Sequence, residues 1–521
     1  VLSPPKPSDI VWIDQYISCR AKPSPLNNRR AELRQGMRGM ASATPGSGVY
    51  EVSAATGLGK TLAALEFASQ VQAKQGEPPG RILYVLPFIS ICDQVEGLLE
   101  DLLDIVGEAD YRVLIHHSLA TDRERDPSIP SERDAGIQYP TRRGHVAWDT
   151  DLTVTTLVRF SETLFQHYKS SVRRFHWLQN AVIIVDECQS IPTKYYDIYQ
   201  ALFDLLARYF NAYVLLMSAT VPAFEGYTLK LPFGGCEASR YQLHVGDLRK
   251  RSEEEFFDEV RQIIAEEPGN GLIVVNSRAR AQRLFWLLRD SEGLEVVHLS
   301  TSMVPRHRRE AIRDVAARID SVGPGERVLL VSTSVVEAGV DLDFDFVVRE
   351  FAPLPSLIQV AGRCNRHATA ATPGNVYVFR VVGNSIYDSI DREGTRTFLQ
   401  SRGDTLEEDT LARSFQEYAC WVKAEHSTRE CLREVQLGRH ESLAHQFRLI
   451  DPRPWESTAY FPHLADPAEQ DLAKKVQAAG VQVSTTKAMA GNSRPLSAEG
   501  FERVYLFPET AYDADVGFRF T

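Results

Sequence analysis

The sequence predicts an α/β protein with two tandem parallel sheets and a smaller mixed region towards its C-terminal end. Two observations support this fold class. Short apolar runs alternate with helical patterns along most of the chain, and these runs fall into two separate series. Apolar runs of this length are typical of parallel strands that are buried on both faces. The 521 residues are enough for about three domains.

The two series set the expected domain limits. Residues 1–24 are expected to form an N-terminal extension or linker, and residues 25–240 the first α/β domain. Residues 241–385 are expected to form the second α/β domain. Residues 386–521 are expected to form an accessory region that mixes turns and short strands.

The first series begins with a strand in which apolar and polar residues alternate, and continues with four apolar runs. A helical pattern spans residues 195–210, and the charged stretch 122–149, punctuated by Pro and Gly, is expected to be a long loop. The expected strands are residues 48–54, 81–87, 151–157, 181–187 and 212–220.

The second series predicts a second parallel sheet. A helix is expected after it, over residues 403–425. The expected strands are residues 271–277, 294–300, 327–333, 344–350 and 375–382.

Composition narrows the class of protein. Charged residues make up 24% and hydrophobic residues 43% of the chain, as in soluble globular proteins. No apolar run approaches the roughly 20 residues that a membrane helix needs, so no membrane partner is expected. Seven cysteines without a C-x-x-C pair indicate reduced thiols in a cytoplasmic protein. The net charge of −11 predicts that nucleic acid binds only in a local groove.

A phosphate-binding loop is predicted after the first strand, in the stretch SAATGLGKT (53–61). Glycines allow the tight turns that bring several N–H groups onto phosphate oxygens, and the following helix adds its N-terminus. Lys60 supplies a charge for the phosphates and Thr61 a hydroxyl for magnesium, although Ala54 replaces the first glycine of the usual pattern. The residues expected to bind ATP are Thr56, Gly57, Leu58, Gly59, Lys60 and Thr61.

Two acidic residues close the apolar run AVIIV and predict hydrolysis. Asp186 and Glu187 stand where a parallel strand ends, and strand ends of this kind face the ligand crevice. Asp186 can hold magnesium, and Glu187 can polarise the attacking water.

Two arginines near the second series are predicted to supply positive charge to the phosphate that is transferred. Arg363 and Arg366 are three residues apart, so on a helix they would share one face. Two guanidinium groups there can act as arginine fingers, which neutralise charge during phosphoryl transfer. Gly339 and Asp341 follow a buried run just before them, where contacts to the nucleotide are expected.

The motifs follow one another in a set order: AATGLGKT, LPFISICDQ, TTL, DECQ, SAT, VVNS, STSVVEAGVDLDFD and QVAGRCNR. This series resembles the superfamily 2 helicases of DExD/H type, which have two RecA-like domains that hold ATP and grip a nucleic-acid strand. LNNRRAELR, IHHSLA, DECQSIP and the late YDADVGF (512–518) are similar, more narrowly, to the CRISPR-associated helicase–nuclease of type I interference systems.

The resemblance implies further roles in ATP hydrolysis. Gln359 stands at the start of the family's QxxGRxxR pattern. Gln189, Ser218 and Thr220 match positions that couple hydrolysis to strand movement. Gln189 replaces the Asp or His of the family's fourth letter, so altered coupling is expected there.

The resemblance also implies contacts to the sugar–phosphate backbone, made by small hydroxyl and amide side chains that do not read sequence. Asn28 and Gln35 are both candidates for reading adenine. The residues that match backbone contacts are Pro87, Gln94, Thr155, Thr156, Asn276 and Thr333.

The family's HD nuclease is not found among the motifs of this chain. The sequence has 13 histidines but no His-Asp dipeptide. His116 and His117 are adjacent and would point to opposite faces of a strand. The HD nuclease module is therefore expected in the same longer polypeptide or in a separate chain.

The resemblance implies an ATP-dependent translocase or helicase, with magnesium, that moves 3′-to-5′ on single-stranded DNA. Its partner would be a CRISPR effector complex that hands over the displaced strand. Another superfamily 2 helicase, acting on DNA or RNA, is a first alternative. An ATP-gated nucleic-acid clamp or adaptor with negligible turnover is a second, and Glu187, Arg363 and Arg366 argue against it.

Overall fold

The chain divides into two compact units, which are described separately. Unit 1 comprises Val1–Ser239, His367–Thr369 and Glu408–Ile450, and unit 2 comprises Arg240–Arg366, Ala370–Glu407 and Asp451–Thr521. The computed structural model describes residues 11–20, 26–54, 57–75, 80–106, 112–116, 148–166, 169–218, 224–232, 239–321, 323, 326–337, 340–368, 370, 372–383, 386–425, 433, 456–467, 469, 472–484, 493–496 and 503–519.

Unit 1 is built on a parallel sheet. Its strand order is β3-β4-β2-β5-β6-β1-β7, and every neighbouring pair is parallel. The five strands expected from the apolar runs are present, and β3 and β7 extend the two edges. Most of the loop expected at 122–149 lies outside the described residues. The strands are β1 (Gly48–Ser53), β2 (Ile82–Leu86), β3 (Val113–His116), β4 (Leu152–Thr156), β5 (Val182–Val185), β6 (Tyr213–Ser218) and β7 (Leu229–Pro232).

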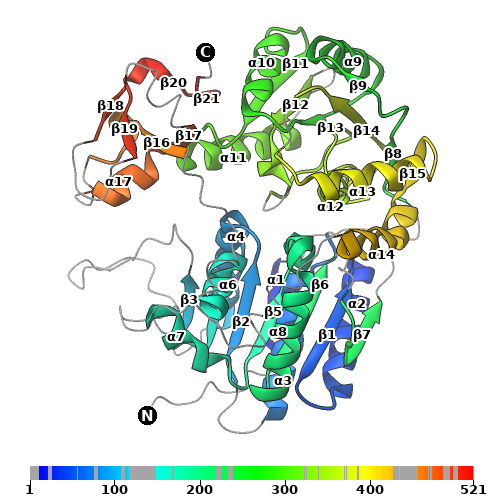
Figure 1. The fold of residues 1–521 in the computed structure, drawn as a ribbon, viewed down its shortest axis with the longest axis vertical. Coiled ribbons are helices and arrows are strands. Elements are labelled where there is room, and N and C mark those ends of the chain that lie inside the picture. Colours follow the sequence, from blue (N-terminus) through cyan, green and yellow to red (C-terminus); the bar gives the residue numbers. More distant parts are fainter. Residues whose placement is uncertain are drawn as a thin grey trace. The chain divides into compact units, whose positions relative to one another are not determined.

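Helices cover both faces of this sheet (Figure 1). Alternate strand residues pack against two separate cores, because successive side chains of a strand point to opposite faces. One core holds side chains of α1 (Val11–Arg20), α2 (Asn27–Ala43), α3 (Lys60–Gln75) and α4 (Ile89–Val106). The other holds those of α6 (Leu157–Phe165), α7 (Lys169–Phe175) and α8 (Tyr196–Tyr209).

Unit 2 contains a second, mostly parallel sheet of order β11-β12-β10-β13-β14-β8-β15, with β9 beside β14. The five expected strands are again present. Only β15 runs antiparallel, to β8. The strands are β8 (Tyr241–His244), β9 (Lys250–Arg251), β10 (Gly271–Val274), β11 (Leu294–Leu299), β12 (Arg327–Ser332), β13 (Phe346–Glu350), β14 (Gly374–Val381) and β15 (Thr405–Glu407).

The helix expected over 403–425 begins later than the sequence pattern indicates. Residues Thr405–Glu407 pair with β8 as a strand, and α14 (Glu408–Glu425) starts directly after them. The strand belongs to unit 2 and the helix to unit 1. In unit 1, Lys423 of α14 forms an ion pair with Asp197 of α8 at 3.0 Å.

Local capping explains where several helices start. Ser252 and Glu255 form a reciprocal capping box at the start of α9, and the Asp388 side chain accepts from the N–H of Ile390 at the start of α13. The helices of unit 2 that cover its large sheet are α9 (Glu253–Glu266), α10 (Arg278–Leu288), α11 (Pro305–Ser321), α12 (Leu354–Ala361) and α13 (Ser389–Gln400). The short 3₁₀ helices are η1 (His176–Leu178), η2 (Cys188–Ser190), η3 (Thr193–Tyr195), η4 (Ser334–Val336), η5 (Pro462–Leu464) and η6 (Glu509–Ala511).

The C-terminal residues form the smaller mixed region that the sequence predicts. It contains a sheet of order β17-β16-β19-β18 and a hairpin of β20 and β21. Side chains from both pack in one core together with Val304, which precedes α11 of unit 2. Gln282 of α10 donates to the carbonyls of Val516 (3.0 Å) and Phe518 (2.7 Å), which ties the hairpin to unit 2. The elements are β16 (Glu456–Tyr460), α17 (Leu472–Ala478), β17 (Gly480–Ser484), β18 (Arg494–Pro495), β19 (Val504–Leu506), β20 (Tyr512–Asp513) and β21 (Gly517–Phe518).

Helix length and apolarity bear on membrane insertion. Among the helices that the structure describes, none combines the length and the apolar character needed to cross a bilayer.

Candidate functional site

The phosphate loop lies between β1 and the start of α3. Gly57 and Gly59 have φ angles of 84° and 72°, a left-handed conformation that side chains disfavour. The α3 helix begins at Lys60, so its unpaired N–H groups are directed towards the loop. Thr56 lies outside the described residues. The local backbone therefore has the form that an anion-binding loop needs.

Lys60 and Glu187 meet at this loop although they are far apart in the chain. Lys60 Nζ lies 3.1 Å from Glu187 Oε1, and Lys60 is only 8% exposed. The second oxygen of Glu187 accepts a hydrogen bond from Gln189 Nε2 at 2.6 Å. In the described structure, the lysine charge is thus paired with the carboxylate expected to polarise water.

Asp186 is held from both sides. Its Oδ1 accepts from the N–H of Glu187 at 2.9 Å, and its Oδ2 accepts from the hydroxyl of Tyr84 at 2.9 Å. Burial raises the pKa of Asp186 to about 6, and the Glu187 carboxylate acts in the same direction. The Lys60 charge and the Tyr84 hydrogen bond oppose this rise. A divalent cation at this carboxylate would favour its ionised form.

Tyr84 is a site residue that the sequence reasoning did not single out. It is fully buried on β2, and the nearby Thr61 side chain also acts on the pKa of its hydroxyl. It therefore connects both residues expected to hold magnesium. The available signal was a lone hydroxyl in the otherwise aliphatic run ILYVL, since a buried hydroxyl needs a partner.

A hydrogen-bond chain continues from the acidic pair to β6. Ser218, at the end of β6, donates to Gln189 Oε1, and Gln189 in turn donates to Glu187. Two of the three residues expected to couple hydrolysis to movement are therefore linked to Glu187. The third, Thr220, lies outside the described residues.

The start of α2 also contacts the phosphate loop. Arg30 donates through Nε to the carbonyl of Gly57 (3.0 Å) and through Nη1 to Asn27 Oδ1 (3.1 Å). Asn28 and Gln35 both belong to this helix, and both remain candidates for reading adenine. The Arg30 contact was not expected from the sequence, because it joins segments on opposite sides of β1.

The two arginines of unit 2 do not lie on a helix, and the expectation that they share a helical face is wrong. The α12 helix ends at Ala361. The next residues pair with Phe344, which donates to the carbonyl of Arg363 and accepts from the N–H of Asn365. Asn365 has a left-handed φ of 45°, so a helix cannot continue. Arg363 and Arg366 extend from this turn.

The same turn brings the predicted nucleotide contacts of unit 2 together. Arg363 is 6% exposed and donates through Nη2 to the carbonyl of Glu337 at 2.9 Å. Arg366 Nε lies 2.8 Å from Asp341 Oδ1. Gln359 is half-buried on α12, and Gly339 lies outside the described residues. The arginines thus adjoin the loop that follows β12.

Most residues expected to contact nucleic acid follow the carboxyl ends of strands. In unit 1, the Thr155 hydroxyl donates to the His116 carbonyl at 2.8 Å, and Thr156 caps α6. Pro87 follows β2, and Gln94 is exposed on α4. These positions face the same edge of the sheet as the phosphate loop, because all the strands are parallel.

In unit 2, the corresponding residues are engaged inside the fold. The Asn276 amide donates to the Phe351 carbonyl at 2.9 Å and accepts from Arg349 at 2.7 Å. Thr333 is buried, and its N–H donates to the Leu299 carbonyl at 3.2 Å. Their roles as nucleic-acid contacts stay predictions.

Of the two adjacent histidines, the structure describes only His116, which contacts a tryptophan. His116 Nδ1 accepts from Trp148 Nε1 at 3.1 Å, and His117 lies outside the described residues. Over the described ranges, no three His, Cys, Asp or Glu side chains are grouped closely enough to hold a metal ion.

Known proteins resemble both units. Residues 37–226 match the family model of DEAD/DEAH box helicases, and residues 267–369 match the model for the C-terminal part of the CRISPR-associated nuclease/helicase Cas3. The CRISPR-associated nuclease/helicase Cas3 of Haloferax volcanii is 23% identical over 475 residues, covering 68% of this chain and 50% of that protein.

Solved structures share the fold. T. fusca Cas3-AMPPNP has a TM-score of 0.71 and 16% identity, covering 99% of this chain and 72% of that chain. A chain of a CRISPR RNA-guided surveillance complex in a pre-nicking state has a TM-score of 0.61 and 16% identity, covering 97% and 71%. The present chain spans about half the length of the curated relatives it matches.

Proposed function

We propose that the chain is an ATP-dependent helicase or translocase, since it is similar to the helicase region of the CRISPR-associated nuclease/helicase family. The observation that supports this most directly is the chain of contacts from Lys60 through Glu187 and Gln189 to Ser218. It connects the expected phosphate-binding loop to the carboxylate expected to polarise water, and then to a strand end expected to couple hydrolysis to strand movement.

The residues present fit ATP and magnesium. Gly57 and Gly59 have the left-handed conformation that a phosphate-binding loop needs. Lys60 would bind phosphate oxygens in place of its Glu187 partner. Thr61 and Asp186, bridged by Tyr84, would hold magnesium. Bound magnesium would supply charge neutralisation, while Glu187 accepts a proton from water. Arg363 and Arg366 would add positive charge during phosphoryl transfer.

The proposed substrate is single-stranded DNA, namely the strand displaced from target DNA in a type I CRISPR system. Similarity to a chain of a CRISPR surveillance complex supports an effector complex as partner. The relatives are named nuclease/helicase, and this chain spans only about half of their length. A nuclease module, in the same polypeptide or in another chain, is therefore part of the proposal, as is a cytoplasmic location.

The test is ATP turnover with and without single-stranded DNA, measured for wild type, Lys60→Ala and Glu187→Gln. Wild type should be stimulated by DNA. Lys60→Ala should lose turnover and nucleotide affinity, because it removes a phosphate charge. Glu187→Gln should keep nucleotide affinity and lose turnover, because only the water-polarising group changes.

Three outcomes would contradict the proposal. Stimulation by RNA but not by DNA would favour an RNA helicase. Binding of ATP and DNA with negligible turnover in wild type would favour a clamp. Normal turnover in Glu187→Gln would remove Glu187 from the hydrolytic site.

A further inference from the structure

Arg349, on β13, is one of the largest side chains that are fully buried in the described structure. A charge taken out of water costs several kcal/mol unless partners replace the lost hydration. Its two terminal nitrogens donate to six acceptors, three of them main-chain or amide oxygens and three from Glu337, Ser356 and Tyr387. The guanidinium is therefore held in one orientation.

The side-chain partners of Arg349 come from four separate segments. Asn276 Oδ1 lies 2.7 Å from Nη1 and follows β10. Glu337 Oε1 (2.9 Å) follows η4, and Ser356 Oγ (3.1 Å) lies on α12. The Tyr387 hydroxyl (2.8 Å) lies between β14 and α13. One side chain thus connects the ends of β10 and β12 to the helix that precedes the arginine turn.

Glu337 connects Arg349 to the predicted finger residue. Its Oε1 accepts from Arg349, from Ser356 Oγ at 2.7 Å and from the Tyr387 hydroxyl. Its main-chain carbonyl accepts from Arg363 Nη2 at 2.9 Å. A change in how Glu337 is held therefore moves the acceptor of Arg363.

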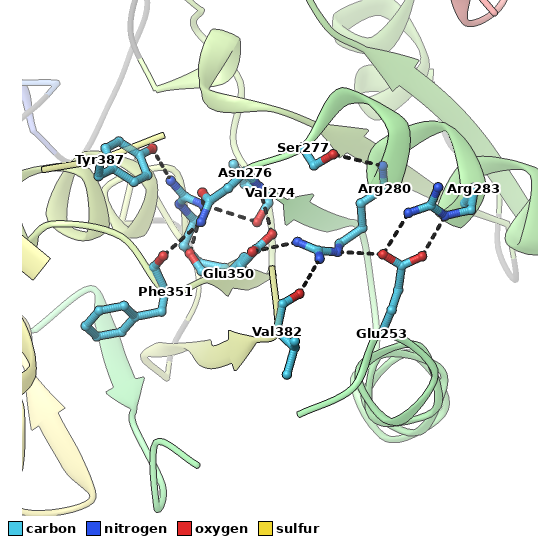
Figure 2. Close-up of polar contacts among 11 residues, drawn as sticks. Glu253, Val274, Asn276, Ser277, Arg280, Arg283, Glu350, Phe351, Val382 and Tyr387 are labelled. Atoms are coloured by element: carbon cyan, nitrogen blue, oxygen red, sulfur yellow. Dashed lines mark hydrogen bonds and ion pairs between the residues drawn. The ribbon is translucent and has the colours of Figure 1, made fainter. Parts of the chain in front are cut away.

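Asn276 connects Arg349 to a second buried ion pair. Figure 2 shows this pair, Arg280 and Glu350, with Asn276 beside Glu350. The N–H of Asn276 donates to Glu350 Oε2 at 2.8 Å, and Glu350 Oε1 lies 2.7 Å from Arg280 Nη1. Arg280 and Arg283 both contact Glu253, at 3.0 and 2.6 Å. The charges alternate in sign from the centre of unit 2 to its surface.

Stability alone is a weak explanation for this network. Well-packed apolar side chains can replace a buried ion pair without loss of stability, and what such pairs can add is one specific arrangement. Here the arrangement includes Asn276, expected to contact nucleic acid, and Glu337, the acceptor for Arg363. Arg349 lies between the two and contacts both side chains.

We propose that Arg349 is a positioning residue that holds Asn276, Glu337 and α12 in one arrangement and so couples nucleic-acid binding to ATP turnover. The inference rests on the proposed function. Arg349 is fully buried, so it acts through its partners. Its guanidinium fork is required, because a lysine ammonium is a single point charge that cannot reach acceptors placed apart.

The test compares two variants with a matched control for each. Arg349→Lys keeps the charge and loses the fork, and Tyr387→Phe removes one hydroxyl from the same cluster. Arg251→Lys is the first control, because Arg251 is 9% exposed and pairs with Glu259 at 2.8 Å. Tyr377→Phe is the second, because its hydroxyl contacts only Glu267 among the described partners. Among the described side-chain hydrogen bonds and ion pairs of the two control residues, none involves Arg349 or its side-chain partners.

ATP turnover is measured over a titration of single-stranded DNA. Both test variants should raise the half-saturating DNA concentration or lower the stimulated kcat by roughly 2- to 30-fold. The KM for ATP without DNA should not change, because the phosphate loop belongs to the other unit. A purely structural role would lower the melting temperature, but it would leave both the half-saturating DNA concentration and the DNA-stimulated kcat of the folded protein at their wild-type values.

The proposal is overturned if either folded test variant keeps wild-type coupling, or if the controls lose coupling equally. Should Arg349→Lys fail to fold, Tyr387→Phe decides the question. A wild-type chain without any DNA-stimulated turnover would instead remove the proposed function, and the coupling role with it.

Discussion

Glu187 has a left-handed backbone conformation, with φ 49° and ψ 48°. For a residue with a Cβ, such a conformation costs roughly 1–3 kcal/mol and persists only where neighbours impose it. Lys60 and Gln189 each hold one carboxylate oxygen. The side chain is thereby fixed at the phosphate loop.

Tyr84→Phe tests the residue that bridges Asp186 and Thr61. Loss of a hydrogen bond to a charged group costs about 1.5–3 kcal/mol, so kcat should fall by roughly 10- to 100-fold. The variant should also need more magnesium for half-maximal turnover. ATP turnover over a magnesium titration measures both effects.

Tyr199→Phe is the matched control, since Tyr199 is fully buried in the same unit and its hydroxyl contacts Ser161 instead. It should keep wild-type kcat. Equal kcat and equal magnesium dependence in Tyr84→Phe and wild type would show that the bridge has no role in turnover.

At the scale of elements, the end of α12 decides how the arginines are presented. Gly362 ends the helix, and the pairing of Phe344 with residues on either side of Cys364 fixes the turn. Arg363 and Arg366 then contact Glu337 and Asp341 within the same unit.

Arg363→Ala and Arg366→Ala should each lower ATP turnover by about two to five powers of ten, by analogy with other arginine fingers. ATP affinity should fall much less. Turnover and nucleotide binding are measured on the same preparations. Arg327→Ala is a suitable control, because Arg327 also donates to main-chain carbonyls, those of Glu267 and Ile264, and should keep wild-type turnover.

Normal turnover in both single variants would contradict the role of the turn. The melting temperature of each variant shows whether it is destabilised. If Arg327→Ala is destabilised as much as the two test variants and also loses turnover, the loss has a structural cause and does not support a finger role.

The buried His298 on the edge strand β11 leads us to expect that unit 2 loses stability at acidic pH. Burial lowers the pKa of His298 from 6.5 to about 3, and the nearby Asp513 opposes this only in part. Between these values the unfolded chain binds a proton that the folded chain does not. Stability therefore falls as the pH falls through this window, by at most about 1.4 kcal/mol per pH unit.

His298→Gln should reduce this pH dependence, because glutamine does not titrate and can still contact Ser300. Between pH 6.5 and pH 5 the wild type should lose about 2 kcal/mol more stability than the variant. Thermal unfolding at several pH values measures the difference. Parallel curves for the two proteins would exclude His298 as the cause.

At the scale of the whole chain, charge limits how nucleic acid can bind. The net charge is −11, and most residues expected to contact the backbone are neutral hydroxyl or amide groups. Several of these already bond inside their own unit, as Thr155 and Asn276 do. Contacts of this kind release few counterions.

The affinity for single-stranded DNA should therefore fall less steeply with salt than for a basic binder, and unrelated strands of equal length should bind equally. Fluorescence anisotropy over a salt series measures the slope. Addition of the effector complex should strengthen binding. Strong sequence preference by the isolated chain, or tight duplex binding that the complex does not improve, would contradict a displaced-strand motor.

The sequence alone determined the fold class and the positions of ten strands, nine of which are apolar runs. Buried parallel strands must be apolar over their whole length, and this pattern is local. The phosphate loop was equally readable, because glycines, Lys60 and Thr61 stand together in one stretch. The acidic pair was readable because it follows directly on an apolar run.

Only the tertiary structure decided which distant residues meet. Tyr84 lies on β2 and Asp186 directly follows the neighbouring strand β5, and Arg349 joins four segments that are separate in the chain. The end of α12 was misread because the pairing with Phe344 overrides the local helical pattern. Such contacts depend on strand order and register, which local residue patterns do not encode.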